Sequence, residues 1–144
     1  MGQMLDRPVT AKDSEWGPQS GPLRLSWSSS SMQGWRTGME DAHVCMTALP
    51  DKALQGVALF GVFDGHGGEQ VAKFCAKHLP EEVCSALRGL GVDCQPETWQ
   101  VGEALVQAFH RIDELLRDPD VSPELKALSN PPPDLARSPR PVVG

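Results

Sequence analysis

Apolar residues follow two different periods along the chain, and the period changes near residue 69. From 57 to 63, seven apolar or glycine residues follow one another, a pattern typical of a strand covered on both faces. From 71 to 87, apolar residues recur at three- and four-residue spacings, which predicts a helix lying on a core. The members of this helical stripe are Val71, Phe74, Cys75, Leu79, Val83 and Leu87.

Pro80 interrupts that stripe, and a proline inside a helix costs about 3 kcal/mol or more. The helix therefore either ends near Leu79 and restarts or kinks there and continues, and the glycines after residue 88 close it. A second helix is predicted from about Pro96, which suits a first turn, to about Leu116. We expect the two helices to form an antiparallel pair packed on the sheet. The apolar stripe of the second helix is Val101, Leu105, Ala108, Ile112 and Leu115.

The segments before these elements are less regular. Residues 1–21 are polar and interrupted by prolines, so we expect a flexible N-terminal arm. Leu23, Leu25 and Trp27 alternate with Arg24 and Ser26, which predicts the start of a strand at Leu23. The serines at 28–31 break the alternation and indicate a solvated loop or a strand edge, with a cluster of phosphorylation sites as the alternative. A further strand is expected over 36–48.

The last segment, 118–144, is rich in proline and has no apolar period. Such a segment buries too little surface to offset its ordering entropy, so we expect a disordered tail. The prolines at 131–133 could instead occupy a polyproline-binding groove on a partner. Residues 22–117 are then left as the folded part, an α+β domain made of N-terminal strands and the helix pair.

Composition narrows the class of protein. The 144 residues allow one domain at most, with 40% hydrophobic residues available for a core. A formal net charge of -6 and scattered Lys and Arg argue against nucleic-acid binding. No run reaches the roughly 20 apolar residues of a membrane span, and the N-terminus lacks the apolar core of a signal peptide. We therefore expect a soluble, monomeric protein of the cytoplasm or nucleus.

Four cysteines are present without a C-x-x-C pair, which argues against a zinc site. Because no secretory signal is seen, we expect reduced thiols, some of them on buried faces. Gly2 follows the initiator methionine, as in N-myristoylation, but Asp6 replaces the Ser or Thr that this signal prefers. An untethered arm is the alternative, and a single lipid chain would give only weak membrane association.

Candidate chemistry begins where the buried strand stops. Asp64 follows that strand directly, and a carboxylate held at the end of a rigid strand suits a metal ligand or a catalytic acid. The glycines at 65, 67 and 68 let the backbone approach an ion or a phosphate closely. The alternative is an ordinary Asp-Gly turn after a strand.

A second polar group precedes it. If 36–48 is a strand, Arg36 and Glu40 share one face by parity, while Asp41 and His43 lie on the other. We therefore expect Glu40 to bind a metal directly and Asp41 to act through a water molecule. A surface salt bridge of about 0 to 1 kcal/mol among Arg36, Glu40 and Asp41 is the alternative. His43 fits a packed or solvated strand residue better than a ligand.

These two groups of residues resemble a known family. The segments SSMQGWRTGMEDAH and FGVFDGHGGEQVAKFCAKHL, in this order, are similar to the N-terminal third of the metal-dependent protein serine/threonine phosphatases of the protein phosphatase 2C (PPM) family. The start MGQMLDRP also looks like that of the animal alpha and beta members. The resemblance covers about residues 1–117 and implies a partial β-sandwich flanked by helices.

The resemblance also implies roles for individual residues. Glu40, Asp64 and the Gly65 carbonyl would bind Mg²⁺ or Mn²⁺, with Asp64 bridging two ions. Arg36 would bind the phosphate of a phosphoprotein substrate. Asp41 would hold a metal-bound water through a hydrogen bond, and His66 would protonate the leaving serine or threonine oxygen. Carboxylate ligands without thiolates suit these hard ions better than zinc.

The chain also departs from the family. The later aspartates that complete the family's metal site have no counterpart here, and the segment from about Asp118 matches nothing in the family. We therefore expect a truncated chain with an incomplete fold, support for one ion at most, and little or no phosphatase activity alone. The alternative is a non-catalytic isoform or fragment that acts as a binding or regulatory protein.

Overall fold

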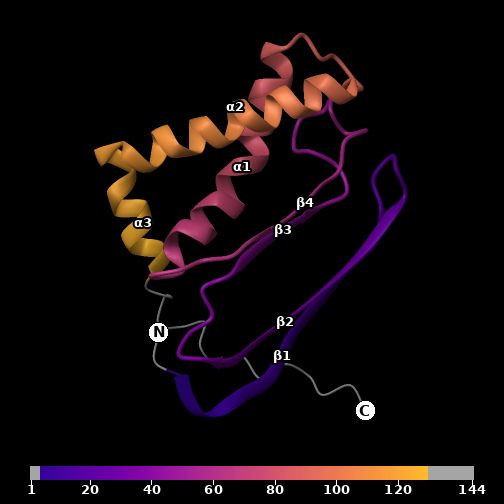
Figure 1. The fold of residues 1–144 in the computed structure, drawn as a ribbon. Coiled ribbons are helices and arrows are strands. Elements are labelled where there is room, and N and C mark those ends of the chain that lie inside the picture. The colour runs from indigo at the N-terminus through magenta and orange to yellow at the C-terminus, as the bar shows by residue number, and fades with distance from the viewer. Residues whose placement is uncertain (1–3, 130–144) are drawn as a thin grey trace.

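The computed structural model describes residues 4–129. Two strand pairs and the helices are arranged in layers (Figure 1): the helices cover one side of the β3–β4 pair, and the long β1–β2 hairpin lies on its other side. This is an α+β arrangement, as the sequence predicted, and it is consistent with a partial β-sandwich. The elements are β1 (Met4–Ser20), β2 (Leu25–Arg36), β3 (Ala42–Met46), β4 (Leu59–Phe63), α1 (Gln70–Gly89), α2 (Thr98–Arg117), a 3-10 turn (Pro119–Val121) and α3 (Ser122–Ser129).

The prediction of an irregular N-terminal arm was wrong for Met4–Ser20, which forms β1 and pairs antiparallel with β2. Pro8 and Pro18 fall where the strand register shifts, so neither proline has to donate a hydrogen bond to a regular ladder. The partner strand β2 follows directly after the turn at 21–24, and its backbone groups pair with those of β1. The serines at 28–31 belong to β2, with Ser14 Oγ and Ser30 Oγ 2.8 Å apart across the hairpin.

The expected strand over 36–48 is confirmed only for Ala42–Met46, because 37–41 leaves the strand geometry. β3 pairs antiparallel with β4, which ends at Phe63 as predicted. Coverage of β4 on both faces was a wrong prediction for the described part of the chain. Leu59 and Phe63 pack against the core, whereas Phe60 is 48% and Val62 is 79% exposed, because only one face of β4 meets the helices.

α1 is a single helix that runs through the buried Pro80, so the alternative in which it ends near Leu79 is excluded. Val71, expected on its buried stripe, is instead 47% exposed. α2 begins after Pro96 with a reciprocal capping box, in which Glu97 and Gln100 each bind the other's backbone N–H. Ala108 and Ile112 are buried as predicted, and Leu105 and Leu115 are partly buried against the core. Ala104 is also buried, whereas Val101, expected on the same stripe, is 37% exposed.

The core lies between the two helices and the β3–β4 connection, with Phe74, Leu87, Leu49 and Leu54 almost completely buried. Asp51 in that connection forms a bidentate ion pair with Arg88 near the end of α1. Hydrogen bonds from Arg88 hold the pKa of the Asp51 carboxyl below its ordinary value. These contacts anchor the connection between β3 and β4 on α1.

The predicted disordered tail is contradicted for the segment up to Ser129, which folds back on α1 as α3. Leu125 and Leu128 pack on the core, and Glu124 binds both Lys77 and His78. The contacts of these partly buried leucines and of Glu124 offset the entropy lost on ordering this segment. Residues 130–144, with the prolines at 131–133, and Gly2 lie outside the described residues. Within 4–129 no helix is long and apolar enough to cross a membrane.

Candidate active site

Three chain segments end at one place beside the sheets. Because β3 and β4 are antiparallel, Ala42 at the start of β3 pairs with Phe63 at the end of β4. Asp41, just before β3, and Asp64, just after β4, are therefore neighbours by register. The end of β2 brings Arg36 to the same region. Local sequence supplies each side chain, and strand pairing brings the side chains together.

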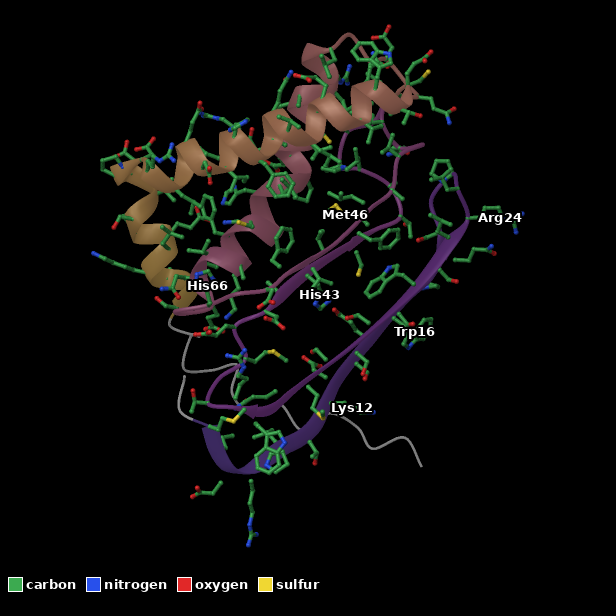
Figure 2. The ribbon with its side chains drawn as sticks, viewed as in Figure 1. Lys12, Trp16, Arg24, His43, Met46 and His66 are labelled. Carbon is green, nitrogen blue, oxygen red and sulfur yellow. The ribbon has the colours of Figure 1, made fainter. Side chains whose placement is uncertain are left out.

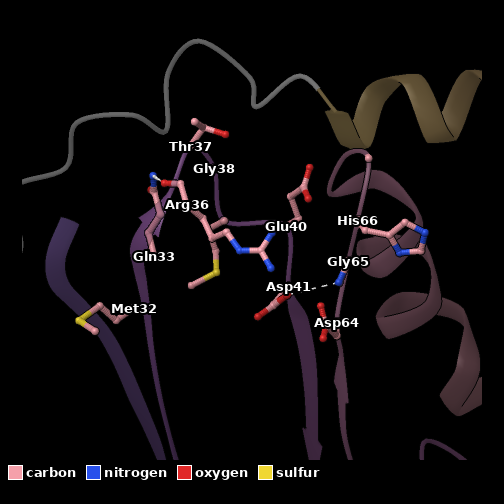
Figure 3. A pocket seen from close by; sticks show the side chains of 12 residues that line it. Met32, Gln33, Arg36, Thr37, Gly38, Glu40, Asp41, Asp64, Gly65 and His66 are labelled. Atoms are coloured by element: carbon pink, nitrogen blue, oxygen red, sulfur yellow. Dashed lines mark hydrogen bonds between the residues drawn. The ribbon is translucent and has the colours of Figure 1, made fainter. Parts of the chain in front are cut away.

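These segments line an open cavity of about 480 Å³ (Figure 3). All six sequence-predicted site residues line it. Met32, Gln33, Thr37, Gly38, Met39 and Gly67 also line it and were not predicted as site residues. All six fall inside the two segments that resemble the family, and Gly67 had been noted for close backbone approach, but no individual role was predicted for them. The full lining is Met32, Gln33, Arg36, Thr37, Gly38, Met39, Glu40, Asp41, Asp64, Gly65, His66 and Gly67.

Glu40 and Asp41 tie the segment before β3 to the loop after β4. The Gly68 N–H donates to Glu40 Oε1 at 2.7 Å, and the Gly65 N–H donates to Asp41 Oδ1 at 3.3 Å. The parity argument that placed these carboxylates on opposite faces does not apply, because residues 37–41 are not a strand. Both carboxylates contact the same loop and line the same cavity.

Gly65 fits against Glu40 because it has no side chain. A Cβ added at Gly65 would lie 2.1 Å from the Glu40 carbonyl oxygen and 2.9 Å from the carbonyl carbon. Carbon atoms in folded proteins do not approach an oxygen so closely. The glycine after Asp64 is therefore required here for close approach of two backbone segments.

Arg36 extends toward Asp41 and the end of β4 in Figure 3. Within the described residues no ion pair joins Arg36 to Glu40 or Asp41, so the surface salt-bridge alternative is not what the structure shows. An arginine without a carboxylate partner keeps its five N–H donors for another anion. The guanidinium group can therefore bind an anion, while the three neighbouring carboxylates call for cations that offset their charge.

The two histidines near this region lie differently. The His66 ring points to the side of the loop away from Arg36 and the carboxylates (Figure 3), and the residue is exposed. His43 lies outside the cavity and contacts Glu15 of the hairpin, which agrees with its interpretation as a strand residue and not a ligand. Figure 2 shows the two residues apart, with His43 on β3 and His66 in the loop after β4.

The four cysteines are unpaired thiols. Cys84 is buried and Cys75 is half-buried, and burial raises the pKa of both thiols. A raised pKa leaves the thiol protonated, which disfavours nucleophilic or metal-binding chemistry. Neither cysteine lines the cavity.

The donor set of the cavity suits a hard divalent cation. Glu40, Asp41 and Asp64 supply carboxylate oxygens, and backbone carbonyls are also available, as Mg²⁺ and Mn²⁺ prefer. Residues 4–129 nevertheless contain no group of three His, Cys, Asp or Glu side chains arranged to hold a metal ion. The cavity therefore fits such a cation in the kind of its donors, while the described residues supply only part of a coordination sphere.

Comparison with known proteins defines the class. The family model for protein phosphatase 2C matches residues 25–129, which include both strand ends and the whole cavity. The chain belongs to the protein phosphatase 2C family.

Curated relatives agree. The chain is 43% identical over 117 residues to "Probable protein phosphatase 2C 21" of Arabidopsis thaliana, covering 81% of this chain and 29% of the relative. It is 38% identical over 117 residues to "Protein phosphatase 1A" of Homo sapiens, covering 81% and 30%. With "Protein phosphatase 1G" of Bos taurus it shares 38% identity over 132 residues, covering 92% and 22%. The chain thus spans less than a third of the length of these three relatives.

Proposed function

We propose that the cavity binds the phosphate of a phosphoserine or phosphothreonine in a protein substrate, as part of a metal-dependent phosphatase centre. One observation carries the proposal: Arg36, Glu40, Asp41 and Asp64, from three segments of a protein phosphatase 2C chain, line one cavity. The guanidinium group of Arg36 can bind the phosphate anion, and the three carboxylates can bind the divalent metal that such a reaction uses. The names of the relatives agree with a phosphatase.

Arg36 is the proposed phosphate ligand. Its planar guanidinium group can donate two parallel hydrogen bonds to phosphate oxygens, which fixes orientation as well as charge. The absence of an Arg36 ion pair among the described residues supports this role, since no internal carboxylate has to be displaced.

Glu40, Asp64 and the Gly65 carbonyl are the proposed ligands for Mg²⁺ or Mn²⁺. Glu40 Oε1 accepts a hydrogen bond from Gly68, which holds the carboxylate in place and leaves Oε2 for a cation. Divalent cations bound there would lower the pKa of a water molecule and neutralise charge on the phosphoryl oxygens. Asp41 would accept a hydrogen bond from the attacking water and so orient it.

His66 is the proposed general acid for the leaving serine or threonine oxygen. Its ring lies on the far side of the loop in Figure 3, so it must rotate toward the cavity to act. The side chain is exposed, and rotamer changes of exposed side chains take place within nanoseconds. The proposed proton transfer is therefore open to this residue once a substrate is bound.

A calorimetric Mn²⁺ titration tests the metal ligands. We expect the chain to bind Mn²⁺ and Asp64→Ala to lose that binding. Asp93→Ala is the matched control, because Asp93 is exposed and does not line the cavity. Equal Mn²⁺ binding by the wild-type chain and Asp64→Ala would contradict the assignment.

We further propose that the 144-residue chain alone hydrolyses phosphoserine peptides slowly or not at all. The support is the partial coordination sphere: no three-ligand metal group is found within residues 4–129. Phosphate release from a phosphoserine peptide, with and without Mn²⁺, measures this directly. Manganese-dependent hydrolysis above a buffer blank, abolished by Asp64→Ala, would refute it.

A non-catalytic binding role is the second candidate, favoured by the open face of β4. Phe60 and Val62 are exposed, and β4 pairs only with β3 within the described part of the chain. Adding the chain to a complete phosphatase of this family separates the candidates. Stoichiometric inhibition that Val62→Lys relieves would favour a binding role, whereas an unchanged rate would count against it.

A further inference from the structure

We propose that Gln33 is a positioning residue that fixes Arg36 for phosphate binding, an inference that rests on the phosphate role proposed for Arg36. Gln33 lines the same cavity and lies three residues before the arginine. Nothing in the sequence pattern separated it from the other polar residues of β2. Its place in the structure gives it a specific task.

The β1–β2 ladder does not hold Arg36 regularly. Gly34 pairs with Val9, and Arg36 pairs with Met4, so one residue on β2 stands opposite four on β1. Pro8, within that bulged part of β1, has no N–H to donate. Backbone hydrogen bonds of a regular ladder are therefore interrupted just where β2 presents the arginine.

Gln33 replaces that missing restraint. Its side-chain Nε2 donates a hydrogen bond of 2.8 Å to the Arg36 carbonyl oxygen. The backbone between them turns through Gly34, which has a φ of 65°. The bond closes a local ring around the end of β2 and fixes the backbone from which the Arg36 side chain extends into the cavity.

Fixing the backbone matters because arginine is long and flexible. Binding an anion with a free arginine costs the conformational entropy of every bond that becomes ordered. A backbone already held in place reduces that cost and narrows the region that the guanidinium group samples. Loss of the Gln33 bond should therefore weaken phosphate binding without removing the group that binds phosphate.

The test uses the full 144-residue chain and inorganic phosphate as the probe, with the Arg36 backbone amide and side-chain Nε–H followed by NMR. Gln33→Met keeps the side-chain length and removes the donor. Gln19→Met is the matched control, because Gln19 Nε2 makes the same kind of bond, 2.7 Å to the Arg24 carbonyl, at the other end of the hairpin.

In Gln33→Met we expect phosphate affinity to fall about 2- to 10-fold, the usual range for loss of one hydrogen bond. The order parameter of the Arg36 amide should fall from the rigid value of about 0.85 toward the flexible range below about 0.6. Gln19→Met should leave both quantities unchanged. If Gln33 only stabilised the fold, the Arg36 order parameter would stay unchanged in variant chains that are folded to the same extent as the wild type. Gln33→Asn, too short to reach the carbonyl, should reproduce the result if the methionine variant folds poorly.

The outcomes separate this inference from the proposed function. If Arg36→Ala binds phosphate as well as the wild-type chain, the proposed phosphate role fails, and the inference fails with it. If Arg36→Ala loses binding while Gln33→Met and Gln33→Asn retain wild-type affinity and a rigid Arg36 amide, only the inference is overturned.

Discussion

The contact between Gly65 and Glu40 allows a sharp test of how the cavity is built. In Gly65→Ala, the new methyl carbon would lie 2.1 Å from the Glu40 carbonyl oxygen. A contact of at least about 3.0 Å is needed, so the two segments must separate by roughly 0.9 Å. The atom in the way is backbone, so no rotamer change can relieve the overlap.

Separation of that size also strains two hydrogen bonds. The Gly65 N–H to Asp41 bond is already 3.3 Å long and would be lost first, while the Gly68 N–H to Glu40 bond at 2.7 Å would lengthen. Forced overpacking costs typically about 1 to 3 kcal/mol. We expect Gly65→Ala to lower the free energy of unfolding by about that amount and to weaken Mn²⁺ binding at least 10-fold.

Urea unfolding and calorimetric Mn²⁺ titration measure the two effects. Gly38→Ala is the control, because Gly38 lines the same cavity and an added Cβ would meet no atom within 4 Å. It should change stability and Mn²⁺ affinity little. A Gly65→Ala chain with wild-type stability and Mn²⁺ affinity would refute the steric reasoning.

Two further predictions concern the scaffold. Leu87→Ala should lower the free energy of unfolding by about 2 to 5 kcal/mol in urea, since Leu87 is 1% exposed, whereas Val71→Ala on the same helix should cost roughly 0.5 kcal/mol. Similar losses for both would argue against this core. Hydrogen bonds from Lys77 and then His78 lower the pKa of Glu124 in the folded chain. Their stabilisation of α3 is therefore fully present above the carboxyl's ordinary pKa of 4.5 and is lost as the pH falls through the lowered pKa of the folded state. Amide exchange of α3 should therefore accelerate in acid in the wild-type chain, and a Glu124→Gln variant that keeps the same pH dependence would contradict this.

The sequence alone determined the elements whose pattern is local. The three- and four-residue spacing predicted both helices, and the apolar run before Asp64 predicted a strand that ends at Phe63. Two separated segments also indicated the protein phosphatase 2C family, which the comparisons show. Each of these signals depends on residues close together in the chain, where side-chain period and backbone geometry are directly linked.

Contacts between separate elements set the features that the local pattern predicted wrongly. Met4–Ser20 is a strand because β2 supplies its hydrogen bonds, and α3 is a helix docked on α1 because Glu124 and its apolar neighbours find partners there. The alternation of strand faces, used to place Glu40 and Asp41 on opposite sides, does not apply to them. Hydrogen bonds from the loop after β4 hold both carboxylates instead. The residues of the cavity were visible in the sequence. Their convergence required the pairing of β3 with β4, which places Asp41 beside Asp64.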